Sequence, residues 1–110
     1  MKKIILFLFL GAGFLGNSQQ MTLKKGVVID SIAVKDSISE NFSLYIPTSF
    51  EMDKNWPILF VFDMEGRGRQ AIRMFIGAAE KQGYILAASN NVNDSLTTSQ
   101  NILITGRMFN

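Results

Sequence analysis

Two stretches of the chain, residues 27–34 and 41–46, alternate between apolar and polar positions. A period of two is typical of half-buried β-strands. Apart from Asp30, one face of the first stretch carries apolar residues, namely Val28, Ile32 and Val34. One face of the second carries Phe42, Leu44 and Ile46. Because the link over residues 35–40 is short and mostly polar, the pattern predicts an antiparallel hairpin.

The pattern changes after this hairpin. Residues 57–62 (PILFVF) are continuously apolar, which predicts a strand buried on both faces, as in a parallel sheet. A glycine-containing turn over residues 63–68 precedes a predicted helix over residues 69–82. The apolar face of that helix carries Ile72, Phe75, Ile76 and Ala79. Gly83 suits the helix C-cap, and residues 84–88 (YILAA) predict another short strand. Strand, helix and strand together predict a βαβ unit.

A last helix is predicted to begin after Thr97 and to run toward Arg107. Thr97 and Gln100 fit a capping box, and Ile102 and Phe109 fall on one face. The elements together predict an α/β fold, with an N-terminal β-hairpin followed by a βαβ unit and a further helix. Such a small sheet buries little apolar surface, so we expect it to be incomplete.

The first 18 residues have the character of a secretory signal peptide. Two lysines precede an apolar run over residues 4–15, and short residues follow at 16–18. A membrane span needs about 20 apolar residues, so we expect cleavage at the end of this segment rather than an uncleaved anchor. The protein is then exported, to the periplasm or outside the cell. Residues 19–26 form a polar lead-in, and residues 27–110 form the domain.

Composition narrows the possible functions. Cleavage removes two of the eleven basic residues and leaves nine, against nine acidic residues. This near-neutral balance argues against nucleic acid as a partner. The chain has no cysteine and no histidine, so it lacks thiolate chemistry, the commonest general base and the commonest metal ligand. We therefore expect no cofactor, no metal and no complete catalytic triad within this chain.

Three segments invite a binding interpretation. Residues 11–16 (GAGFLG) match a dinucleotide-binding fingerprint, but they lie in the apolar run with no strand before them, so the match is interpreted as coincidental. Residues 63–69 (DMEGRGR) follow a predicted strand, where α/β sheets bind ligands. They form either an anion or oxyanion site or, as the local pattern favours, an ordinary turn. Residues 89–94 (SNNVND) are interpreted as a polar loop rather than a calcium site.

From Phe42 to Arg107 the chain resembles the front part of an α/β-hydrolase of the secreted esterase and polyhydroxyalkanoate-depolymerase type. The matching segments are, in order, FSLYIP, PILFVFD-x-x-GRG, AAEKQGYILAASNN and a helix ending near GRMF. The resemblance implies a serine hydrolase that cleaves an ester bond, or alternatively an amide bond, through an acyl-enzyme. Its substrate would be a small or polymeric ester, and no stable membrane anchor would remain after signal cleavage.

The resemblance also implies an oxyanion-hole loop. In such enzymes the loop after the strand corresponding to residues 57–62 donates one backbone N–H to the oxyanion. Carried onto this chain, the loop covers residues 63–66, with Met64 as the first candidate donor and Glu65 as the second. Many family members have His-Gly where this chain has Asp63-Met64. The candidates for the binding crevice are Asp63, Gly66, Arg67 and Asn90.

The nucleophile elbow of this family, G-x-S-x-G, does not occur in the chain, and the acid and the histidine follow the serine in chain order. The resemblance therefore implies a chain truncated before the elbow and inactive alone. The alternative is a small exported binding protein, complete at residue 110, that uses its unpaired sheet edge to bind a partner. A third hypothesis assigns anion binding to residues 66–69.

Overall fold

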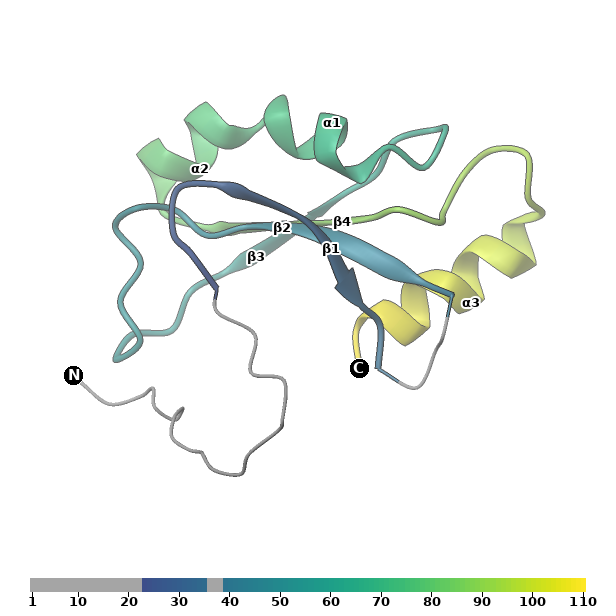
Figure 1. The fold of residues 1–110 in the computed structure, drawn as a ribbon, viewed down its shortest axis with the longest axis horizontal. Coiled ribbons are helices and arrows are strands. Elements are labelled where there is room, and N and C mark those ends of the chain that lie inside the picture. Colours follow the sequence, from purple (N-terminus) through teal and green to yellow (C-terminus); the bar gives the residue numbers. More distant parts are fainter. Residues whose placement is uncertain (1–22, 36–38) are drawn as a thin grey trace.

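Four strands form one mixed sheet in the computed structural model, which describes residues 23–35 and 39–110 (Figure 1). The strands are β1 (Val28–Ala33), β2 (Asn41–Tyr45), β3 (Ile58–Val61) and β4 (Ile85–Ser89). Their spatial order is β1-β2-β4-β3; β2 is antiparallel to both of its neighbours, and β3 is parallel to β4. The α/β class, the hairpin and the parallel strand pair are confirmed. The predicted signal peptide and the GAGFLG motif lie outside the described residues.

Three helices cover the sheet. They are α1 (Gly68–Arg73), α2 (Ile76–Gln82) and α3 (Thr98–Met108). Helices α1 and α2 lie on one side of the sheet and α3 on the other (Figure 1). The prediction of one continuous helix over residues 69–82 is wrong, because the chain leaves the helix at residues 74–75. The apolar period did not reveal this break, since Ile72 and Ala79 are fully buried on either side of it. Phe75, predicted to be buried, is exposed.

The main core lies between the sheet and helices α1 and α2. Its buried side chains are Tyr45, Val61, Ala71, Ile72, Ala79, Leu86 and Ala88. Leu86 and Ile72 are completely enclosed, and burial of each side chain stabilises the fold by about 1.5–3 kcal/mol. Gly83 ends α2 in the left-handed conformation, at φ 81° and ψ 54°, which confirms the predicted C-cap.

A β-bulge in β1 changes which side chains share a face. Val28 pairs with Tyr45, whereas Ile32 pairs with Phe42, and the register shifts between the two pairs. Opposite residues of paired strands share a face, but Tyr45 and Phe42 point to opposite faces of β2. The prediction that Val28 and Ile32 lie on one face is therefore wrong. A bulge inserts one extra residue and breaks the period of two.

Strand β3 has a neighbour on one side only within the described residues. The prediction that it is buried on both faces is wrong there, since Ile58 is 50% exposed, Leu59 37% and Phe62 45%. Val61 points into the core. Phe60 packs on Phe109, the C-cap residue of α3, with ring centroids 4.5 Å apart. A continuously apolar strand thus lies at an open edge of the sheet.

Ile104 is the single buried residue of helix α3. The capping box is confirmed: Thr97 Oγ1 accepts from the Gln100 N–H at 3.1 Å, and Gln100 Oε1 accepts from the Thr97 N–H at 2.8 Å. Ile102 and Phe109 line the same groove, as their predicted shared face requires, but both are exposed. The apolar face predicted for this helix is therefore largely open.

Tyr45 ties β2 to α2. Its hydroxyl donates to Glu80 Oε2 at 2.5 Å, and Thr48 donates to the same carboxylate from N–H (2.9 Å) and Oγ1 (2.6 Å). Burial, and then the hydrogen bond to Glu80, raise the pKa of Tyr45 from 10.0 to about 12.

We therefore expect Tyr45 to stabilise the fold fully below pH 10, and this contribution to be lost as the pH rises toward 12, because the unfolded tyrosine ionises first. The measurement is the free energy of unfolding of the native chain and of Tyr45→Phe, followed by circular dichroism between pH 8 and 12. The difference between the two proteins should shrink across this window. A difference that does not change with pH would contradict the prediction.

Candidate functional site

The turn over residues 63–67 connects the carboxyl end of β3 to the start of α1. The carboxyl ends of parallel strands meet at one edge of a sheet, so this turn lies beside the loop that follows β4. The Asp94 N–H donates to the Met64 carbonyl at 2.8 Å, and the Gly68 N–H donates to Asn90 Oδ1 at 3.0 Å. Asn90 also borders Gly66, where a Cβ would lie 3.1 Å from its carbonyl oxygen. The four predicted crevice residues thus gather at one edge.

The carboxylate of Asp63 accepts hydrogen bonds from other residues of the same turn. Its Oδ2 accepts from the Glu65 N–H at 2.8 Å, the Arg67 N–H at 3.2 Å and Arg67 Nε at 2.9 Å, and its Oδ1 accepts from Arg67 Nη2 at 3.2 Å. The hydrogen bond from the Arg67 side chain, followed by that from the Glu65 N–H, lowers the pKa of Asp63 to about 2. Gly66 adopts φ 75°, a left-handed conformation that a glycine adopts without strain.

The two candidate oxyanion donors differ in whether their N–H already donates to an acceptor within the described residues. The Glu65 N–H is taken by the Asp63 carboxylate. The Met64 N–H donates to no acceptor within residues 23–35 and 39–110, although the carbonyl of the same residue is bound by Asp94. The geometry favours Met64 over Glu65. The oxyanion role itself stays a prediction.

The hypothesis of anion binding at residues 66–69 fits the geometry poorly. The three N–H groups of Gly66, Arg67 and Gly68 all donate to acceptors within the protein. The guanidinium of Arg67 is paired with Asp63, and that of Arg69 lies 3.0 Å from Asp30 Oδ2. Because these donors are already used, an anion would have to displace existing bonds. The ordinary-turn interpretation fits this part of the turn better.

The sequence did not indicate how Asn90 is held. Its side chain is bound to polar groups of β1, β2 and α1, including Ser43, which is fully buried on β2. The period of two places Ser43 opposite Phe42 and Leu44, on the face that the pattern predicts to be polar, so no local signal indicated this buried hydroxyl. The identity of the partners depends on strand register, which the sequence did not provide.

We expect Arg67→Ala to raise the pKa of Asp63 from about 2 toward its ordinary value of 3.8, because the largest cause of the lowering is removed. Because the pKa is lowered in the folded protein, Asp63 stabilises the fold above pH 3.8, and this stabilisation is lost as the pH falls through about 2. In the variant the carboxyl titrates at higher pH and its contribution to the free energy of unfolding becomes smaller. An NMR pH titration of the Asp63 carboxyl measures the change. Arg69→Ala is the control, and an equal effect of both substitutions would contradict the assignment.

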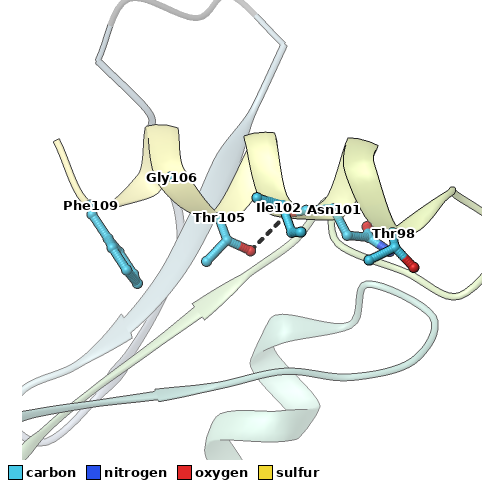
Figure 2. Close-up of a pocket in the computed structure, with 6 residues that line it drawn as sticks. All are labelled: Thr98, Asn101, Ile102, Thr105, Gly106 and Phe109. Carbon is cyan, nitrogen blue, oxygen red and sulfur yellow. Dashed lines mark hydrogen bonds between the residues drawn. The ribbon is translucent and has the colours of Figure 1, made fainter.

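A groove of about 450 Å³ runs along one face of α3 (Figure 2). It is lined by Thr98, Asn101, Ile102, Thr105, Gly106 and Phe109. Thr105 Oγ1 bonds the Asn101 carbonyl at 2.8 Å, the contact drawn as a dashed line in Figure 2. None of the lining side chains is titratable, so the groove offers no acid or base, and the turn remains the candidate site.

Residues 23–35 and 39–110 contain no group of three or more acidic residues placed to hold a metal ion. Among the helices of this part of the chain, none has the length and apolar character needed to cross a membrane.

Comparison with known proteins found no family model, no curated protein and no solved structure that matches the chain.

Proposed function

We propose that this chain supplies the front part of an exported serine hydrolase, which cleaves an ester bond, or alternatively an amide bond, through an acyl-enzyme. The observation that carries the proposal is the Met64 N–H at the carboxyl end of a parallel strand, which donates to no acceptor among the residues that the structure describes. A preorganised N–H aimed at a developing oxyanion lowers the reaction barrier by about 3 kcal/mol.

The topology supports the same proposal. The sheet begins with an antiparallel hairpin, and the βαβ crossover then places β4 between β2 and β3. The proposed hydrolase sheet opens with such a hairpin and βαβ unit, and its next strand would pair with β3. The exposed apolar side chains of β3 are those that such a strand would cover. The proposed fold is therefore the front of an α/β-hydrolase sheet.

The proposal divides the chemistry between two parts of a longer polypeptide. This chain contributes one oxyanion donor and one wall of the crevice. The nucleophilic serine, the histidine that takes its proton and the acid that orients the histidine come from the later part. The chain has no histidine, so we expect no turnover from its 110 residues alone.

The test begins with the coding region beyond the codon for Asn110, where an in-frame G-x-S-x-G followed by an acid and a histidine is expected. The longer protein should hydrolyse p-nitrophenyl esters. Met64→Pro removes the N–H and should lower kcat by about 10²–10³ fold. Met64→Ala keeps the N–H and is the matched control. A coding region without the elbow, or equal activity of the two variants, would contradict the proposal.

A second candidate function is favoured by the open edge of β3. An exposed apolar edge strand pairs readily with another strand, so the chain could serve as an exported binding protein. In that case Leu59→Lys should abolish partner binding, while Met74→Lys, at an exposed position between α1 and α2, should not. A secreted chain that stays monomeric and retains no partner would count against this function.

A further inference from the structure

Asn90 links four segments of the chain at the candidate site. Its Oδ1 accepts from the Gly68 N–H of α1 at 3.0 Å and lies 3.2 Å from Ser43 Oγ of β2. Its Nδ2 donates to the Asp30 carbonyl of β1 at 3.0 Å and to Asn41 Oδ1 at 2.6 Å. An asparagine amide offers two donor hydrogens and two acceptor positions. Asn90 uses both donors and accepts from Gly68, while the single hydroxyl hydrogen of Ser43 is shared between Asn90 Oδ1 and the Asp30 carbonyl.

The partners of Asn90 are themselves fixed. Asp30 lies where the register of β1 shifts, and its carbonyl also accepts from Ser43 Oγ at 2.7 Å. The hydroxyl of Ser43 is fully buried. Gly68 touches the end of β4 so closely that a Cβ would lie 2.4 Å from Asn90 Oδ1 and 2.8 Å from the Ala88 carbonyl oxygen. The amide of Asn90 is therefore held in one orientation.

These contacts determine where the turn ends. Strand β3 holds the turn at its start, and Asn90 holds Gly68 at its end. Between these points Asp63 closes the turn, and the Asp94 N–H holds the Met64 carbonyl. The Asp63 carbonyl, which belongs to the same peptide unit as the Met64 N–H, accepts from the Gly66 N–H at 3.0 Å. This peptide unit thus has little freedom to rotate.

We propose that Asn90 is the positioning residue for the Met64 amide, which it aims by anchoring Gly68. This assignment rests on the proposed hydrolase function for its catalytic consequence, whereas its structural part can be tested on the chain itself. Asn90 does not touch substrate; it acts through the turn. The predicted crevice residue thus gains a specific role.

The structural test is NMR of the full chain. Asn90→Ala should increase hydrogen exchange of the Gly68 amide about tenfold and shift the Met64 amide resonance, because a hydrogen bond worth about 1.4 kcal/mol is lost. Asn41→Ala, which removes one acceptor of Asn90 Nδ2, is a milder second variant and should shift the same two resonances by less. Ser95→Ala, in the same loop, is the control, because its hydroxyl donates to Asn93 Oδ1 and not to a partner of Asn90. Unchanged Gly68 and Met64 amides in a folded Asn41→Ala or Asn90→Ala chain would overturn the assignment.

The catalytic test uses the longer protein. Asn90→Ala should lower kcat per titrated active site at least tenfold with KM unchanged, whereas a purely structural role would lower the number of active sites instead. An inactive native protein would overturn the hydrolase proposal and leave the NMR result to decide the role of Asn90. An active native protein whose Asn90→Ala variant keeps kcat per titrated site would overturn the inference alone.

Discussion

Leu86→Ala is expected to lower the free energy of unfolding by about 3 kcal/mol, within the range of 2–5 kcal/mol typical of large-to-small core substitutions. Leu86 lies on β4, between β2 and β3, and its side chain is completely buried. Its neighbours in the core include Tyr45 and Ile72, which cannot both move to fill the space. The substitution therefore leaves a cavity at the centre of the only well-packed side of the described sheet.

Urea unfolding, followed by the fluorescence of Trp56, the single tryptophan, measures this loss. Leu59→Ala is the matched control, because Leu59 is the register partner of Leu86 on β3 but is 37% exposed. Its expected cost is about 1 kcal/mol. Equal losses for the two variants would show that β3 is covered in solution, contrary to the described sheet.

Gly68→Ala is expected to destabilise the fold by about 3 kcal/mol, the upper part of the usual range for overpacking. The new Cβ would lie 2.4 Å from Asn90 Oδ1, 2.8 Å from the Ala88 carbonyl oxygen and 3.1 Å from the Ser89 carbonyl oxygen. The two carbonyls belong to β4, so they cannot retreat without disturbing the sheet. Helix α1 must shift instead, and its Gly68 N–H then loses Asn90 as an acceptor.

Gly77→Ala provides the control for this substitution. Gly77 lies in α2, and a Cβ there would meet no heavy atom within 4 Å. Alanine is favoured over glycine in a helix by about 0.5–1 kcal/mol, so this variant should be more stable than the native chain. The same urea unfolding experiment should therefore give opposite signs for the two substitutions. Destabilisation by both would indicate that the effect of Gly68→Ala is not steric.

The position of the candidate site in the fold could be predicted from the sequence, but the hydrogen bonds within it could not. The turn after β3 and the loop after β4 each follow an apolar run, so their meeting at one edge of the sheet could be predicted. The pairing of Asp63 with Arg67 is local, because four residues separate them. The choice between Met64 and Glu65 as donor depends on the tertiary structure, which decides that the Glu65 N–H donates to the Asp63 carboxylate.

The sequence by itself determined the elements whose cause is local. The hairpin, the βαβ unit, the capping box at Thr97 and the C-cap at Gly83 all follow from periods and contacts within a few residues. Tertiary structure alone decided the bulge in β1, the break between α1 and α2 and the open edge of β3. These features depend on which strands become neighbours and in what register. The bond from Asn90 to the Asp30 carbonyl joins residues 60 positions apart, and no local pattern specifies such a distance.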